Sequence, residues 1–219
     1  MGKQSIVDNS AFISEEINDK SKGNMKMQNT KHEIKAILIG ASTGGPRVIF
    51  DIITKLPKDI NIPVLVVQHM PSGFTKAFAE RLDKNSCVTV VEASDGDKIM
   101  PNVVYIAPGG YHMLVSSGNI KLDLTPSIHG VRPAVDKLFI SATEYYGGCV
   151  IACICTGMGR DGVEGVKVIK SVGGYVIAQD ELTSTVFGMP KAAIETGCVN
   201  IILPDNKIAD ELIKLVIRK

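Results

Sequence analysis

A serine flanked by glycines is the first candidate for chemistry in this chain. The segment reads Ala36-Ile-Leu-Ile-Gly-Ala-Ser-Thr-Gly-Gly-Pro46, so a glycine lies two residues on either side of Ser42. The apolar run before it predicts a buried strand, and the apolar residues of 48–56 recur at the helical period. Ser42 is therefore expected on a tight strand-to-helix turn with the G-x-S-x-G spacing of a nucleophile elbow. Strand-to-helix turns of this shape are also typical of phosphate-binding loops.

A histidine and an aspartate follow two other predicted strands. His69 comes directly after the run of residues 63–68, and Asp161 lies in a glycine-rich turn after the run of residues 150–155. Parallel sheets bind ligands outside the carboxyl ends of their strands, where these side chains are expected to meet. A serine hydroxyl is a weak nucleophile until a base takes its proton, and a carboxylate orients that base. Ser42, His69 and Asp161 are therefore the predicted nucleophile, base and orienting acid.

Each of these side chains also has a simpler explanation. Ser42 and Asp161 both precede a predicted helix, where Ser and Asp are common N-caps. A single histidine after a strand is more often structural than catalytic. His112 and His129 are alternative bases, whereas His32 lies in the polar N-terminal segment.

Two enzyme classes fit the pattern less well. The α/β-hydrolases place their histidine after the acid in the chain, but here His69 precedes Asp161. A dinucleotide site needs an acidic residue at the end of the second strand, and that strand ends in Gln68-His69. None of the five tyrosines is followed four residues later by a lysine, the pair that short-chain dehydrogenases use. A nucleotide-binding oxidoreductase is the weaker alternative.

The elements that must position these residues alternate along the chain. Residues 1–33 predict a flexible polar tail with a short helix near 14–19, and residues 34–219 predict a single α/β domain. Alternating strands and helices predict a doubly wound, mostly parallel sheet, with an antiparallel β-hairpin added over 113–124. The predicted strands are 36–39, 63–68, 88–91, 103–107, 150–155, 175–178 and 199–203. The predicted helices are one that starts at Pro46 and ends near 57, one from about 74, 134–146, 163–172, a short one ending near 196, and 208–217.

Composition limits the partners and the compartment. The 219 residues carry a net charge of +1, which gives no argument for nucleic acid or an anionic membrane as the main partner. The apolar runs are too short for membrane insertion, and no signal peptide is visible, so a cytoplasmic protein is expected. Cys149, Cys153 and Cys155 predict small buried side chains in a strand rather than a metal or redox site. No metal or organic cofactor is expected.

Six strings in one order resemble a known family. They are G-A-S-T-G-G-P, V-V-Q-H-M, Y-I-A-P-G-G-Y-H, R-P-A-V-D, T-G-M-G-R-D-G and V-F-G-M-P-K-A-A-I-E-T-G. Together, over residues 34–203, they closely resemble the catalytic domain of the protein-glutamate methylesterases of bacterial chemotaxis. The resemblance implies a serine esterase with a Ser42, His69 and Asp161 triad. Its substrates would be γ-glutamyl methyl esters on the cytoplasmic helices of chemoreceptors, and some family members also deamidate receptor glutamines.

The resemblance also implies where the substrate lies. The oxyanion would face backbone N–H groups, for which Thr43 and Met158 are the candidates, although Met158 is also explained as a core residue. His112, Arg132 and Thr43 are candidates to line the substrate cleft.

Members of this family commonly carry a receiver domain before the catalytic domain, and the first 33 residues are too short for one. Three alternatives stay open: a separate catalytic subunit with a regulatory receiver protein as its partner, an unregulated form, or a fragment of a longer chain. A non-catalytic module that binds methylated receptors is the alternative from another functional class.

Overall fold

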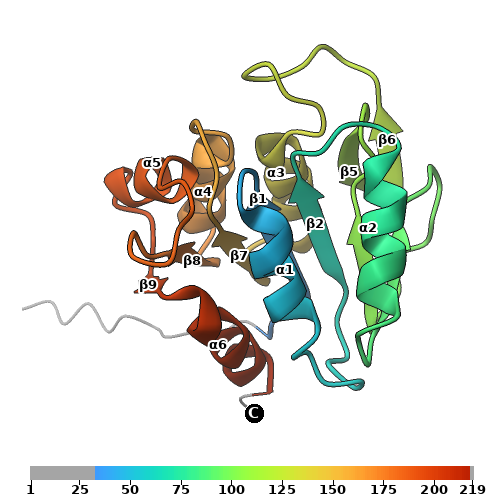
Figure 1. Cartoon of the computed structure of the whole chain (residues 1–219), viewed down its shortest axis with the longest axis horizontal. Helices are drawn as coiled ribbons and strands as arrows, with labels where there is room; N and C mark the ends of the chain where they lie inside the picture. The colour runs from blue at the N-terminus through green and yellow to red at the C-terminus, as the bar shows by residue number, and fades with distance from the viewer. Residues whose placement is uncertain (1–32, 218–219) are drawn as a thin grey trace, which may run out of the picture. The chain divides into compact units, whose positions relative to one another are not determined.

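A computed structural model describes residues 33–217, which form an open seven-stranded sheet with helices on both faces (Figure 1). Every neighbouring pair in this sheet is parallel, and the strand order is β3-β4-β2-β1-β7-β8-β9. A separate antiparallel hairpin joins β5 to β6. The strands are β1 (Ala36–Ala41), β2 (Val64–Gln68), β3 (Thr89–Glu92), β4 (Val103–Ile106), β5 (His112–Ser116), β6 (Asn119–Asp123), β7 (Val150–Ile154), β8 (Tyr175–Gln179) and β9 (Ile201–Leu203).

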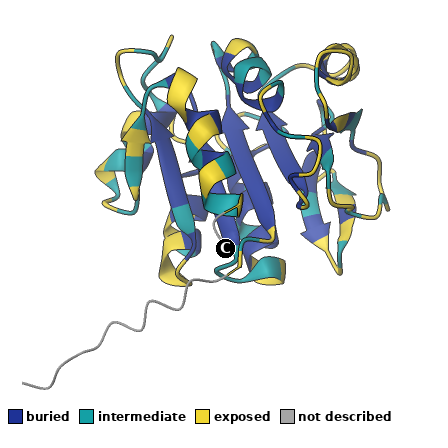
Figure 2. Ribbon diagram, turned by 90° about the horizontal axis from the view of Figure 1, so that it is seen from below, coloured by how far each residue is buried: buried dark blue, intermediate teal, exposed yellow. Residues whose placement is uncertain are grey.

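Six helices cover the sheet within the described residues. They are α1 (Gly45–Ile53), α2 (Phe74–Asp83), α3 (Val135–Tyr146), α4 (Val163–Ser171), α5 (Met189–Glu195) and α6 (Asp205–Ile217). Helices α1, α2 and α6 pack on one face, while α3, α4, α5 and the hairpin pack on the other. The central strands are therefore buried on both faces, as their continuous apolar sequences predict (Figure 2).

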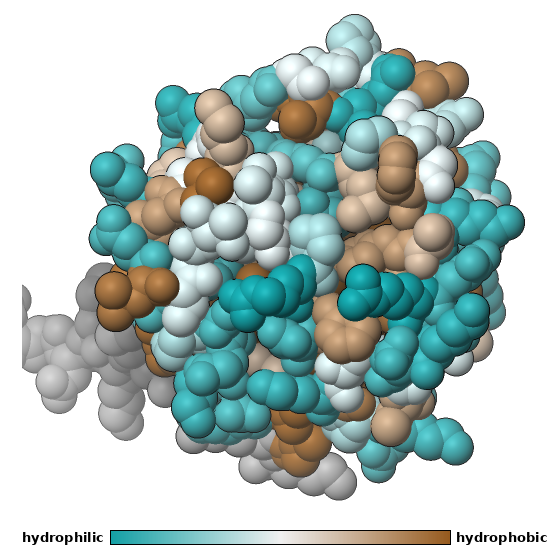
Figure 3. Space-filling view, viewed as in Figure 1, coloured by the Kyte–Doolittle hydropathy of each residue, from teal (hydrophilic) through white to brown (hydrophobic). Residues whose placement is uncertain are grey.

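The outer surface differs from this interior. On the face of α1 and α6, hydrophilic residues predominate and the hydrophobic ones lie in separate small groups (Figure 3). No helix within residues 33–217 is long and apolar enough to cross a membrane.

The predicted fold class is confirmed, and the differences lie at the ends of elements. Helix α1 begins at Gly45, so Pro46 lies in its first turn as predicted. Helix α6 begins at Asp205, before the apolar stripe predicted as its start. The predicted tail helix near 14–19 lies outside the described residues.

Strand β1 lies at the point where the strand order reverses. The chain continues from β1 to β2 on one side, and β7 later pairs with β1 on the other side. The connections that leave β1 and β7 therefore diverge to opposite faces, and open α/β sheets bind ligands at the carboxyl ends of such strands. Ser42 and the loop containing Asp161 follow β1 and β7, so the fold positions both at this edge of the sheet.

The core on the α3 side gives a stability prediction. Phe139 of α3 is 0% exposed, whereas Phe74 at the start of α2 is 64% exposed. Phe139→Ala should lower the free energy of unfolding by about 3–5 kcal/mol, because it leaves a cavity between α3 and the sheet. The matched variant Phe74→Ala should cost less than about 1 kcal/mol. Urea unfolding measures both, and equal losses in the two variants would contradict this placement of the core.

Candidate active site

Ser42 lies on a turn whose backbone is held from two sides. Its N–H donates to the carbonyl of Thr156 (3.0 Å), and its carbonyl accepts the N–H of Gly45 (2.8 Å). The N-cap of α1 is Gly44, at φ 83, and no side chain caps the helix. Glycine suits this left-handed conformation because it lacks a Cβ. Ser42 is therefore not the helix cap, so the simpler explanation of this residue is wrong.

His69 is placed beside Ser42 by the strand register. Ala41 pairs with Gln68 across β1 and β2, and the His69 N–H donates to the Ala41 carbonyl (3.0 Å). Neighbouring strands lie about 4.8 Å apart, so the residues that follow this pair are neighbours. The side chain of His69 is 9% exposed.

Asp161 accepts hydrogen bonds from His69 and from the start of α3. Its Oδ2 is 2.8 Å from His69 Nε2 and 2.6 Å from the Val135 nitrogen, and its Oδ1 accepts from the Asp136 N–H (3.0 Å). The N-cap of α4 is Gly162, so Asp161 does not cap the helix that follows it. Its carboxylate instead occupies the N-terminus of α3, where free N–H groups and the helix dipole stabilise an anion.

These contacts keep Asp161 ionised although it is buried. Burial raises the pKa of this carboxyl group, but the hydrogen bonds from His69, Asp136 and Val135 lower it by more, so its pKa lies below the ordinary value. An ionised Asp161 accepts a proton-bearing Nε2 and so sets the tautomer of a neutral His69, with the Nδ1 lone pair free.

The structure joins two of the three predicted residues by a hydrogen bond. The hydrogen bonds of the described residues connect His69 to Asp161 but include none between the Ser42 hydroxyl and His69. Catalytic hydrogen bonds are often long before substrate binds and shorten in the complex.

The two predicted oxyanion donors are placed near this turn. Thr43 follows Ser42 directly and is exposed, and Met158, two residues after Thr156, is 76% exposed. Neither N–H donates a backbone hydrogen bond within residues 33–217. The exposure of Met158 shows that the alternative explanation, a core side chain, is wrong.

His112 lies inside the protein rather than on an open cleft. It is 0% exposed, its Nδ1 accepts the Ala134 N–H (3.1 Å), and its Nε2 is 3.2 Å from the Pro126 carbonyl. Both ring nitrogens therefore have protein partners at the base of the loop that leads to α3. His112 thus fixes that loop, and it cannot touch a substrate without first being uncovered.

Arg132 lies in the same loop and reaches across it. Its Nη1 donates to the carbonyls of Leu124 (2.9 Å) and Thr125 (3.0 Å), while its buried Nε has no partner among the described residues. His129, the other alternative base, is 44% exposed, with Nε2 3.9 Å from Asp136. Neither side chain is hydrogen-bonded to Ser42, His69 or Asp161.

Several buried polar side chains that sequence analysis did not select brace the site. The Thr156 hydroxyl donates to the Thr43 carbonyl (2.9 Å), and the Thr156 N–H donates to Gln179 Oε1 (2.7 Å). Asp136 accepts the Gly165 N–H (2.8 Å) in the first turn of α4. Burial raises the pKa of Asp136 despite this hydrogen bond. A polar residue at the end of an otherwise apolar strand is the signal that would have found Gln179.

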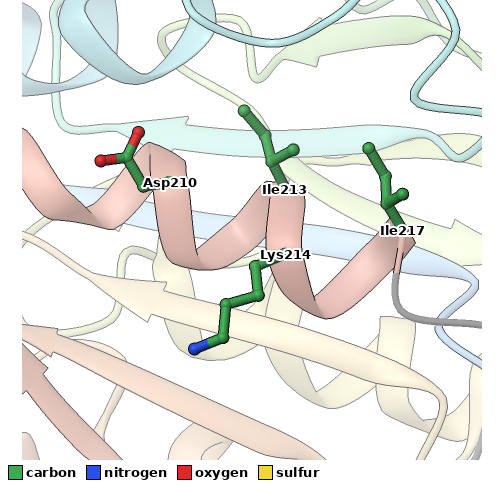
Figure 4. A pocket seen from close by; sticks show the side chains of 4 residues that line it. All are labelled: Asp210, Ile213, Lys214 and Ile217. Atoms are coloured by element: carbon green, nitrogen blue, oxygen red, sulfur yellow. The ribbon is translucent and has the colours of Figure 1, made fainter.

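A surface groove lies elsewhere, on α6. It is lined by Asp210, Ile213, Lys214 and Ile217, and the two isoleucines lie on the same side of the helix (Figure 4). No group of three or more His, Cys, Asp or Glu side chains that could hold a metal ion occurs among residues 33–217. Cys153 and Cys155 are fully buried in the core, as predicted, but the prediction is wrong for Cys149, which is half-buried and precedes β7.

Comparison with known proteins adds an independent observation. Residues 37–212 match the family model described as CheB methylesterase. The catalytic domain of the Thermotoga maritima CheB methylesterase has a similar crystal structure, with a TM-score of 0.80 and 49% sequence identity. That match covers 84% of this chain and 99% of the solved chain.

Two curated relatives carry the name protein-glutamate methylesterase/protein-glutamine glutaminase. The one from Clostridium acetobutylicum is 55% identical over 184 residues, and the one from Thermotoga maritima is 50% identical over 186 residues. The matches cover 84% and 83% of this chain, but 53% and 54% of the relatives. The chain thus spans about half the length of the curated relatives it matches.

The buried carboxylate gives a pH prediction. Because the pKa of Asp161 is lower in the folded chain than the ordinary 3.8, its ionised form stabilises the fold above that value, and this contribution is lost as the pH falls through the folded pKa. Asp161→Asn should therefore cost about 1–3 kcal/mol near neutral pH and progressively less in acid. Urea unfolding at a series of pH values measures the difference from wild type.

The matched control is Asp59→Asn, which replaces an exposed aspartate. The effect of Asp59→Asn on the free energy of unfolding should be small at every pH measured. A cost of Asp161→Asn that is constant down to the acid limit of folding would contradict the ionised, hydrogen-bonded carboxylate.

Proposed function

The chain belongs to the CheB methylesterase family, and we propose that it hydrolyses methyl esters of glutamate side chains on the cytoplasmic helices of chemoreceptors. The observation that carries this proposal is the part-buried hydrogen bond between His69 and Asp161, next to Ser42 at the carboxyl ends of the central strands. An oriented imidazole beside a serine on a strand-to-helix turn is what acyl transfer to serine requires. The relatives named protein-glutamate methylesterase/protein-glutamine glutaminase support this choice of substrate.

In the first half-reaction Ser42 is acylated. Because Nε2 of His69 is engaged by Asp161, Nδ1 is the nitrogen that takes the proton as the Ser42 oxygen attacks the ester carbonyl. Asp161 stabilises the imidazolium that forms, without itself becoming protonated. The bond between the carbonyl carbon and the methoxy oxygen then breaks, the proton passes to that oxygen, and methanol leaves.

In the second half-reaction water replaces methanol. His69 takes a proton from a water molecule as the water oxygen attacks the carbonyl carbon of the glutamyl ester on Ser42. The ester bond then breaks, the proton returns to Ser42, and the free glutamate side chain is released. Water is the only co-substrate that these steps consume.

The negative charge on the carbonyl oxygen needs hydrogen-bond donors. We assign this role to the N–H groups of Thr43 and Met158. The Ser42 N–H is unsuitable because it already donates to Thr156. One such donor contributes on the order of 3–4 kcal/mol to the transition state.

The same centre would deamidate glutamine. With a receptor glutamine in place of the ester, ammonia is the leaving group and the acyl-enzyme is identical. Because the proposed substrate is the cytoplasmic part of a receptor, the reaction would take place in the cytoplasm. Arg132, in the loop before α3, is proposed to contact the receptor helices. Regulation by a separate receiver protein remains a prediction.

The decisive test is the release of methanol from methylated receptor fragments. Ser42→Ala should lower kcat for methanol by at least about 10⁴-fold, because no other group can form the acyl-enzyme. Release of ammonia from receptor glutamines should be lost to the same degree. Ser171→Ala, on an exposed serine at the end of α4, is the matched control. Methylated receptor that binds the chain without being hydrolysed would instead support a non-catalytic binding module.

The base is tested by comparing two histidines. His69→Ala should reduce kcat by several orders of magnitude, on the scale of the loss from Ser42→Ala, because residues of a triad act as a unit. His129→Ala should leave kcat within about threefold of wild type, since this histidine contacts no triad residue. Steady-state methanol release measures both. The opposite order of effects would move the base to His129.

A further inference from the structure

We propose that Gln68 is a positioning residue that holds the serine turn and the catalytic histidine in register. This inference rests on the function proposed above. The Nε2 amide group of Gln68 donates to the carbonyl of Ser42 (2.9 Å) and to the carbonyl of His69 (3.0 Å). One side chain thus connects the backbone of the nucleophile to that of the base.

The direction of the amide follows from its partners. Both acceptors are carbonyl oxygens, so only the NH₂ end of the amide can face them. Its two hydrogens satisfy the two carbonyls, and a change in the relative position of the two strand ends would lengthen at least one of the bonds. The backbone hydrogen bonds between β1 and β2 end at the His69 N–H, so the Gln68 side chain connects the two strands one residue beyond that point.

Only the donor end of the Gln68 amide has hydrogen-bond partners within residues 33–217. Gln68 is 2% exposed at the end of a strand whose other residues are aliphatic, and its Oε1 has no partner among the described residues. By contrast, the amide of Gln179 at the end of β8 is bonded at both ends, to Thr156 and Thr183. The side-chain hydrogen bonds of Gln68 are thus confined to the main chain of Ser42 and His69.

The start of α1 accommodates this amide. A Cβ on Gly45 would collide with Gln68 Oε1 and with the Cβ of Ala41, so the first residue of α1 must lack a side chain for the amide to occupy its position. The glycine after Gly44 in the serine turn therefore has a role separate from the left-handed cap. Gly45→Ala displaces the amide without removing it and also presses on Ala41, so it is a second variant that disturbs this contact.

The test uses Gln68→Met, which keeps the length of the side chain and removes both donors. Displacing reacting groups by about 1 Å costs on the order of 100-fold, so kcat for methanol release should fall about 10- to 100-fold. KM for the receptor fragment should change by less than about threefold, because Gln68 is buried and does not contact substrate. Gly45→Ala should reproduce this split between kcat and KM.

A second variant gives a readout that a purely structural role would not. Gln68→Glu has the same shape, and burial raises the pKa of a carboxyl group. When the carboxyl group of this variant is ionised, its negatively charged oxygen lies against the carbonyls of Ser42 and His69. When the carboxyl group is protonated, it can donate a hydrogen bond to one of these carbonyls. The ratio of its kcat to that of wild type should therefore rise as the pH is lowered, with both proteins shown to be folded by circular dichroism.

Ser141→Ala is the matched control, since it removes a buried hydrogen bond to the Val115 N–H in the hairpin, remote from the serine turn. Its kcat should stay within about twofold of wild type. If Ser42→Ala keeps its turnover, the proposed function fails. If Ser42→Ala is inactive but Gln68→Met matches Ser141→Ala in kcat, the role of Gln68 alone is overturned. If Gln68→Met does not fold, the test rests on Gln68→Glu. A ratio of its kcat to the wild-type kcat that does not change with pH would then overturn the role of Gln68.

Discussion

The site depends on one buried anion, the carboxylate of Asp161, and on the groups that compensate for its burial. An ionised carboxylate inside a protein is very unfavourable unless hydrogen bonds replace the water it has lost. Here two N–H groups at the start of α3 and one ring nitrogen of His69 replace it. The N-terminus of α3 must therefore lie over the loop that follows β7. In return, Asp136 of α3 accepts an N–H from the first turn of α4, so the two helix starts fix each other.

The order of the strands turns this local arrangement into a site. Because β1 lies between β2 and β7, the loop after β1 has the loops after both neighbours beside it. The Thr156 carbonyl holds the Ser42 N–H from one side, and the Gln68 amide holds the Ser42 carbonyl from the other. Three segments that are far apart in the sequence thus meet through hydrogen bonds to the main chain of Ser42.

Sequence patterns predicted the scaffold better than the contacts within it. Apolar runs and helical periods are local, so they predicted each strand and helix, and strand ends pointed to Ser42, His69 and Asp161. The caps were less predictable, because the cap of α1 depends on the left-handed backbone of Gly44 and not on the nearest serine. Asp161 binds a helix that begins 26 residues earlier, and no local pattern shows such a contact. His112 resembles a cleft residue in sequence, yet the hairpin and the loop to α3 enclose it.

The distribution of hydrogen bonds around Ser42 separates two requirements of catalysis. The backbone of Ser42, the proposed nucleophile, is fixed by Thr156, Gly45 and Gln68, whereas its hydroxyl is not bonded to His69 among the described residues. A fixed backbone lowers the cost of orienting the reacting atoms, since little freedom remains to be lost on binding. A hydroxyl without a fixed partner can still rotate toward the imidazole as substrate binds. The polar groups around the turn contact Ser42 through its main chain, so the proposed effect of Gln68 on the rate requires no contact with the substrate.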